Sequence, residues 1–431
     1  MSAPLAARPS DAATPAPAAA SDAGPSSGML RSVRAYPAFR LMLIGTLATN
    51  SAFWMYQVAV GWLALELTDS PAFVGLAGFV GGIPLLLLAL PAGVLIDRFD
   101  GRVVLLAGQA GVLLVAAVFA VLVGMGVVRP WVLLALVFAY GSAMSFVFPS
   151  RTTMVPSLVD RPDLTNAIAL NSATQNATRV LGPSLAGVLI ALVGVSGTFA
   201  VAAMLQVVAL ATTHRLPRGR PGGEGRSPMG WSAMTVGFRV VAASPFLTAL
   251  ILLALAPTVL VMPYLNLMPV FARDVLDLGS AGLGLLLAGV GLGTVGGALS
   301  VARWERLRSR RQPQVAMATA YALLVIAFAV TPVVAVDVAL LFLAGWSSAA
   351  YFALNQTALQ LNVDDEVRGR VFSVYLLTWG LLPLGQLPTG LVADAIGAPV
   401  SVAGASTLAL IGIALIAWRF PSLRSASARA A

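Results

Sequence analysis

The sequence contains no cysteine and no lysine, and it has a single histidine among its 431 residues. Without cysteine the chain forms no disulfide, no thiolate metal site and no thiol nucleophile. One histidine is too few for a histidine-based metal centre. A Walker-type phosphate loop requires a lysine, so direct ATP drive through that motif is excluded.

Charged residues are also scarce. They make up 10% of the chain, whereas 58% of the residues are hydrophobic, a composition typical of a protein surrounded by lipid. The net charge of +9 comes from arginines that lie beside apolar stretches and not on one soluble face, so we expect no nucleic-acid binding. No nucleophile-base constellation is present, and we expect neither an enzyme nor a bound metal or cofactor.

About a dozen apolar stretches are each long enough to cross a bilayer. We therefore predict an all-α membrane protein with twelve transmembrane helices. The predicted helices cover residues 40–66, 71–96, 102–126, 130–151, 162–190, 195–214, 245–272, 279–303, 314–332, 335–360, 366–393 and 398–419.

The arginines concentrate in every second gap between these stretches. Of the remaining arginines, Arg129 and Arg273 fall in the other gaps and Arg179 lies within a predicted helix. The positive-inside rule then places both termini in the cytoplasm and the protein in the cell membrane. The longest internal polar gap divides the helices six and six, which predicts an N-terminal tail (1–37), a first half (38–214), a linker (215–244), a second half (245–420) and a C-terminal tail (421–431).

The two predicted halves share a repeated sequence. Residues 182–188 (GPSLAGV) match residues 385–391 (GQLPTGL), and Gly194 aligns with Gly397 at the same offset. Small residues favour close packing of membrane helices, so we expect packing roles for Gly182, Pro183, Gly187, Gly385 and Gly390. Two repeated halves that meet around a central site are typical of transporters, and we predict two pseudo-symmetric six-helix halves.

The segment 93–102 (GVLIDRFDGR) is similar to the loop motif G-x-L-a-D-r-x-G-r-[KR] of the major facilitator superfamily, with Asp100 as an additional residue. Residues 61–63 (GWL), 67–71 (LTDSP) and 368–371 (RGRV) support the similarity. On these motifs the chain resembles the drug-efflux and siderophore-efflux branch of that superfamily over residues 38–420.

The resemblance implies a gate at the cytoplasmic face. In the outward-facing state the loop would latch onto the start of the helix at 366–393. The residues concerned are Gly93, Asp97, Arg98, Gly101 and Arg102 in the loop, and Gly369 and Arg370 in the helix. A turn that only sets topology is the alternative. The corresponding loop of the second half has Trp304 and Glu305 where the first has Asp97 and Arg98.

Three polar residues share one face of the predicted helix at 162–190. Asn171, Gln175 and Arg179 are spaced four residues apart. An arginine within a membrane helix is costly and usually faces a cavity or a partner, which makes Arg179 our strongest single site candidate. The alternative is a side chain that extends to the cytoplasmic interface.

The resemblance also implies a central cavity lined by the first, fourth, seventh and tenth helices. The polar and aromatic residues that we assign to it are Asn50, Trp54, Gln57, Tyr140, Tyr264, Asn355 and Gln356. Such a cavity suits an amphipathic organic substrate that is neutral to anionic. Helix packing through interhelical hydrogen bonds is the alternative for each of these residues.

The predicted function is export of a small organic molecule, namely a drug, a siderophore or a secreted metabolite, by a monomer that uses alternating access. Exchange against protons rests on the resemblance alone, since Glu66, Asp337 and Asp394 lie close to predicted helix ends and no carboxylate lies at mid-span. The alternatives are a lysophospholipid transporter of the same fold and a membrane sensor that transports nothing.

Overall fold

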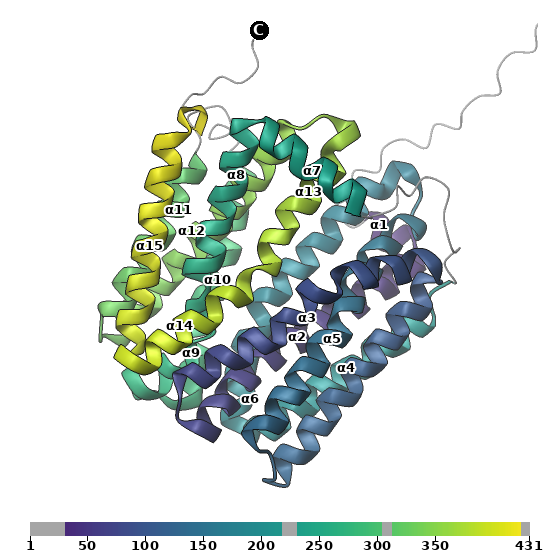
Figure 1. Ribbon diagram of the computed structural model, residues 1–431. Helices are drawn as coiled ribbons and strands as arrows, with labels where there is room; N and C mark the ends of the chain where they lie inside the picture. Colours follow the sequence, from purple (N-terminus) through teal and green to yellow (C-terminus); the bar gives the residue numbers. More distant parts are fainter. Residues whose placement is uncertain (1–30, 218–230, 304–312, 424–431) are drawn as a thin grey trace, which may run out of the picture.

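The computed structural model describes residues 31–217, 231–303 and 313–423, and all regular structure in these ranges is helical. Two bundles of long helices lie side by side, one from each part of the sequence (Figure 1). The short helix α1 (Arg31–Ala35) precedes the first bundle, and α7 (Trp231–Ala243) lies between the bundles in the chain.

The N-terminal bundle consists of α2 (Pro37–Thr68), α3 (Pro71–Arg98), α4 (Gly101–Gly124), α5 (Pro130–Met154), η1 (Val155–Ser157), η2 (Arg161–Asp163) and α6 (Leu164–His214). The C-terminal bundle consists of α8 (Pro245–Ala256), η3 (Pro257–Val261), η4 (Met262–Leu265), α9 (Met268–Val270), η5 (Phe271–Val275), α10 (Gly279–Arg303), α11 (Pro313–Val330), α12 (Val334–Leu361), α13 (Asp365–Gly380), α14 (Leu382–Ile396), α15 (Ala398–Arg419) and η7 (Pro421–Leu423).

Capping residues determine where α3 and α4 begin. Ser70 precedes Pro71, and its hydroxyl oxygen accepts a hydrogen bond from the amide of Phe73 at 3.2 Å. Asp100 accepts one from the amide of Arg102 at 2.9 Å. Both contacts satisfy amides that have no partner within the helix. The predicted helix at 71–96 begins at the same residue as α3.

Glycine and proline interrupt several predicted spans. The predicted helices at 162–190 and 195–214 form the single element α6, which breaks at Gly194, where φ is 72° and ψ is 178°. The predicted helix at 245–272 is divided into α8, η3, η4, α9 and η5, because Pro257, Pro263 and Pro269 lack the amide hydrogen that a continuous helix needs. Similarly, the span at 366–393 is divided into α13 and α14 just before Pro383.

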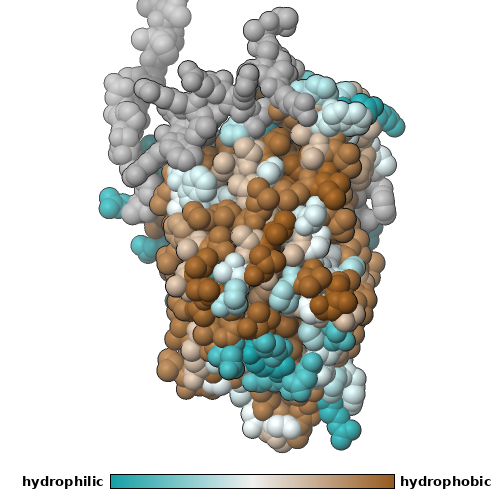
Figure 2. Space-filling model, turned by 90° about the vertical axis from the view of Figure 1, so that its left-hand side faces the viewer, coloured by the Kyte–Doolittle hydropathy of each residue, from teal (hydrophilic) through white to brown (hydrophobic). Residues whose placement is uncertain are grey.

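Ten segments within the described ranges are long and apolar enough to cross a membrane. One of these segments covers the whole of α6, although that helix breaks at Gly194. The 32-residue helix α2, which carries several polar residues, is not among the ten. Apolar side chains cover most of the face seen in Figure 2, and hydrophilic ones gather towards its ends. The chain is therefore a multi-pass membrane protein of the helical class; the number twelve stays a prediction.

The predicted linker at 215–244 contains the helix α7. Residues 218–230 lie outside the described ranges, but α7 packs against α13, and the carbonyl of Arg370 lies against Gly237. A side chain at Gly237 would collide with that carbonyl. The boundaries of the tails, halves and linker stay a prediction.

Candidate functional site

Polar contacts between the two bundles gather towards one end of the molecule. We call the end where α2 finishes and α3 begins the Asp69 end, and the opposite end, where α3 finishes and α4 begins, the Arg102 end. The contacts between bundles run from α3 to α14 and from α6 to α10. Each pair joins one helix of the N-terminal bundle to one of the C-terminal bundle (Figure 1).

A carboxylate of α14 holds the start of α3. The Ser70 hydroxyl donates to Asp394 Oδ1 at 2.7 Å, and the amide of Ala72 donates to the same oxygen at 3.3 Å. Since the first amides of a helix carry a partial positive charge, a carboxylate at this place is favourable. Asp394 therefore acts as a cap that one bundle supplies to a helix of the other.

Arg273 makes a second contact at the Asp69 end. It pairs with Asp69 of the N-terminal bundle at 2.9 Å and donates to the carbonyl oxygen of Leu65 at 3.2 Å. Deeper between the bundles, the Asn266 side-chain amide donates to the carbonyl oxygen of Val74 at 3.0 Å. Polar contacts thus join the bundles at the Asp69 end and for about one helical turn below it.

The repeated glycines lie at equivalent contacts in the two bundles. Gly187 of α6 packs directly on Gly284 of α10, and Gly390 of α14 packs on Gly75 of α3, where an added Cβ would lie 2.7 Å from the Gly75 Cα. The other pair, Gly182 and Gly385, faces a helix of its own bundle. Gly182 lies against Trp54, and Gly385 lies against the carbonyl of Val259. Pro183 follows Gly182 within α6 and does not break it.

At the Arg102 end the start of α13 packs on α7. A Cβ built on Gly369 meets no atom within 4 Å, and Arg370 contacts Gly237 of α7 through its carbonyl. In the loop, Gly93 is buried, Arg98 is exposed, and the guanidinium of Arg102 donates to the carbonyl oxygen of His214 in the same bundle. A Cβ on Gly101 would touch only Met154, at 3.7 Å. The side chain of Asp97 and residues 304–312 lie outside the described part.

A cavity of about 110 Å³ lies between the bundles, formed by α2, α3, α5, α13 and α14. Of the residues predicted to line the substrate cavity, Gln57 and Tyr140 line this one. Phe53, Phe148, Trp379 and Gln386 are further members of its wall. The Tyr140 ring stacks on Tyr56 with 3.5 Å between ring centroids, and both tyrosines line the cavity. Both side chains are otherwise buried in the bundle core.

Arg179 lies between the two bundles. Its guanidinium carbon is 5.6 Å from the ring centroid of Trp54 in α2 and 4.8 Å from that of Trp379 in α13, and its side chain is exposed. Both distances are within the range of cation–π attraction. Because Trp379 belongs to the opposite bundle, Arg179 faces the space between the bundles rather than lipid.

The remaining polar candidates of the N-terminal bundle lie inside it. Asn50 and Asn171 are 5% and 6% exposed, and Asn171 accepts a hydrogen bond from the Thr46 hydroxyl at 3.4 Å. Gln175 is half-buried on the face that it shares with Arg179. Arg179, the last of the three spaced residues, contacts Trp379 of the other bundle.

The candidates of the C-terminal bundle are not part of the cavity wall. Tyr264 is 1% exposed and packs against Tyr321 at 6.3 Å in the core of this bundle. Asn355 is fully buried and donates to the carbonyl oxygen of Leu250 at 3.2 Å, which joins α12 to α8. Gln356 is half-buried on α12.

Arg151, the last residue of the predicted helix at 130–151, is a buried arginine that the sequence analysis did not single out. It is 3% exposed at the end of α5, and it donates to the Thr49 hydroxyl at 2.8 Å, to Thr46 at 3.3 Å and to the carbonyl oxygen of Met42 at 3.5 Å. All three acceptors belong to α2 and are neutral. Its position at the edge of an apolar stretch gave no sign of this burial.

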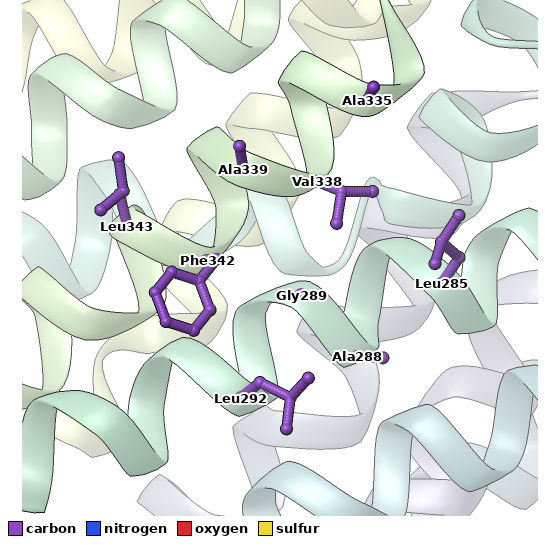
Figure 3. Close-up of a pocket in the computed structure, with 9 residues that line it drawn as sticks. All are labelled: Leu285, Ala288, Gly289, Leu292, Ala335, Val338, Ala339, Phe342 and Leu343. Carbon is purple, nitrogen blue, oxygen red and sulfur yellow. The ribbon is translucent and has the colours of Figure 1, made fainter.

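A larger groove of about 520 Å³ lies on the C-terminal bundle between α10 and α12 (Figure 3). Its nine lining residues are apolar, among them the exposed Leu285, Leu292 and Phe342. No polar side chain lines it, so it offers no group for orienting a substrate. We assign the candidate site to the space between the bundles.

Comparison with known proteins gives a consistent family. A family model described as transmembrane secretion effector matches residues 32–431. The staphyloferrin A transporter of Staphylococcus aureus is 25% identical over 370 residues, which cover 83% of this chain and 90% of the relative. The multidrug efflux pump Tap of Mycolicibacterium fortuitum is 26% identical over 394 residues, covering 89% and 96%. The enterobactin exporter EntS of Salmonella typhimurium is 28% identical over 403 residues, covering 89% and 92%.

Solved structures show the same fold at lower identity. A bacterial homologue of the human lysosomal transporter Spinster, in an inward-facing and unoccupied conformation, has a TM-score of 0.71 and 16% identity, covering 91% of this chain and 99% of that structure. The nucleoside transporter NupG has a TM-score of 0.67 and 12% identity, covering 90% and 99%. These relatives are membrane transporters and not enzymes. The chain belongs to the transmembrane secretion effector family of the major facilitator superfamily.

Proposed function

We propose that this protein exports a small organic molecule, of the siderophore or drug class, by alternating access in exchange for protons. One observation carries the proposal: Arg179 contacts a tryptophan of each bundle. Polar contacts join the two bundles between this arginine and the Asp69 end. A site that both bundles share becomes accessible from opposite sides when the bundles rock. The names of the relatives, two siderophore transporters and a multidrug efflux pump, support the substrate class.

The arginine distribution orients this mechanism in the membrane. It places the termini in the cytoplasm and the Asp69 end outside, so we assign the present arrangement to an inward-facing state of a monomer in the cell membrane. The outer gate then consists of the Asp394 cap on α3 and the Arg273–Asp69 pair. A molecule that enters from the cytoplasm would reach Arg179 before it reaches this gate.

The inner gate forms in the other state. We propose that the loop with Asp97 and Arg98 meets the start of α13 when the outer gate opens. The open surroundings of Gly369 support this proposal, because an approaching loop would meet no side chain there. We propose that the bundles pivot at Gly187 and Gly390, where the helix backbones of the two bundles are in direct contact.

Asp337 is the carboxylate that we propose for proton exchange. It is fully buried in the first turn of α12, and neither of its carboxylate oxygens has a hydrogen-bond partner among the described residues. Ionisable side chains buried within membrane segments are characteristic of proton pathways. The position of Asp337 near a predicted helix end did not indicate this burial.

The test is export from proteoliposomes that contain the purified chain. The panel comprises dyes, antibiotics, metal-chelating organic acids and lysophospholipids, each measured with and without an imposed pH gradient. The proposal predicts movement of a soluble organic compound that the gradient accelerates at least about tenfold and that Asp337→Asn slows to the gradient-free rate. Movement of lysophospholipid alone, or equal rates with and without the gradient, would contradict it.

A further inference from the structure

Arg179, which is exposed between the bundles, differs from the buried Arg151 in what its guanidinium contacts. Arg151 donates to three acceptors of α2 and is therefore committed to the fold. For Arg179, no described residue accepts a hydrogen bond from the guanidinium, and no described carboxylate forms an ion pair with it. The contacts that the described residues offer this guanidinium are the ring faces of Trp54 and Trp379, with the Tyr375 side chain also near.

Flat aromatic surface surrounds this charge. Trp379 packs against Phe352 of α12 with 4.9 Å between ring centroids, and Trp54 packs against Phe53 at 5.2 Å. Trp379 also lines the cavity of about 110 Å³ whose wall includes Phe148. That volume is of the same order as an engineered cavity of about 150 Å³ that binds benzene.

The backbone of α6 is built to hold this arrangement. Gly182 follows Arg179 by three residues and so shares its face of the helix. A Cβ on Gly182 would lie 2.6 Å from the Trp54 Cβ. Because glycine stands there, α2 approaches α6 closely enough for the Trp54 ring to reach the guanidinium.

We propose that Arg179, Trp54 and Trp379 form the binding site for an aromatic carboxylate, in which the carboxylate bonds the guanidinium and the ring packs on the tryptophans. A single guanidinium presents a planar pair of N–H donors that matches one carboxylate, and its charge repels organic cations. The inference rests on the proposed function, since it identifies the substrate class of the exporter. Trp54 belongs to one bundle and Trp379 to the other. An aromatic ring that packs on both tryptophans therefore contacts both bundles.

Binding of 2-naphthoate tests this site, with the uncharged isostere 2-naphthamide as the comparison. The full-length chain in detergent is titrated with each compound by calorimetry, without any pH gradient. We expect 2-naphthoate to bind at least about tenfold more tightly than 2-naphthamide, because the uncharged amide cannot form the charged hydrogen bonds that the carboxylate forms with the Arg179 guanidinium. Arg179→Gln should abolish the difference in affinity between the two compounds. Trp379→Leu should weaken the binding of both compounds about fivefold.

Matched controls are Arg129→Gln and Trp418→Leu, which change an exposed arginine and an exposed tryptophan and should leave both affinities unchanged. Equal affinities for acid and amide in the unmodified protein, or a preference that survives Arg179→Gln, would overturn the proposal. The comparison in the unmodified protein stands even if a variant fails to fold.

The outcomes separate this site from the proposed function. Preferential binding of the acid by a protein that moves no organic compound in proteoliposomes would retain the site and refute export. Gradient-driven export of neutral or cationic compounds, with no preference for the acid in binding, would retain export and refute the site.

Discussion

Arg151 and Arg179 differ in what their guanidinium groups contact. Arg151 donates to neutral acceptors of α2, whereas Arg179 lies near the rings of Trp54 and Trp379. The spacing of Asn171, Gln175 and Arg179 predicts one shared face of α6, and Arg179 contacts Trp54 and Trp379. The spacing did not indicate that Arg151 would be buried, because burial depends on α2, which supplies all of its acceptors. Helical periodicity gives a shared face but does not identify the neighbour that this face meets.

The same limit explains the uneven outcome among the predicted cavity residues. Gln57 and Tyr140 line the cavity, whereas Tyr264 and Asn355 lie in the core of the C-terminal bundle. Tyr264 follows the breaks at Pro257 and Pro263, where the segments η3 and η4 replace a regular α-helix, so its direction could not be read from α-helical spacing.

Substitution of Asp394 tests the outer gate at the residue scale. Asp394→Asn keeps an acceptor for the Ser70 hydroxyl but removes the charge at the start of α3, so we expect the population with an open outer gate to rise roughly twofold to fivefold. Spin labels on Met125→Cys and Val330→Cys, exposed ends of α4 and α11, report the outer distance; the chain has no native cysteine to interfere.

The control for this substitution is Asp277→Asn, in the connection before α10, which removes a nearby acid with no described partner in the other bundle. An unchanged distance distribution for Asp394→Asn, or an equal change for Asp277→Asn, would contradict the role of the cap.

At the scale of helices, the repeat was the most informative part of the sequence. Gly187 and Gly390 occupy matching positions, and each touches a glycine of the opposite bundle, Gly284 or Gly75. The order and class of the helices could be read from apolar runs and arginines. The π-helical and 3-10 segments between Pro257 and Val275 could not, because they depend on how neighbouring helices accept the unpaired carbonyls.

Gly187→Ala tests the packing of the halves. The added methyl group would overlap the Gly284 backbone, so α6 and α10 must separate at a cost of about 1–3 kcal/mol. We expect the open-gate population measured by the outer label pair to rise about tenfold, as 1.4 kcal/mol corresponds to a factor of ten. Gly404→Ala is the control, since a Cβ there meets no atom within 4 Å. Equal behaviour of the two variants would exclude a role for the close glycine contact.

At the scale of the whole molecule, the proposed alternating access requires that the two ends of the bundles move in opposite directions. The bundles pack together through α3 with α14 and through α6 with α10, so opening the proposed outer gate must bring the Arg102 ends of the bundles together if each bundle moves as a body. The fold implied by the superfamily resemblance is confirmed by the family match and the solved structures. The rocking motion and its coupling to protons stay predictions.

The most direct measurement is the inner distance between spin labels on Arg161→Cys and Leu361→Cys, which are exposed near the Arg102 ends of the two bundles. It is recorded in the unmodified chain and with Gly187→Ala, beside the outer pair. Alternating access predicts that the inner distance shortens in the variant as the outer distance lengthens. An inner distance that stays constant, or that lengthens together with the outer distance, would contradict alternating access.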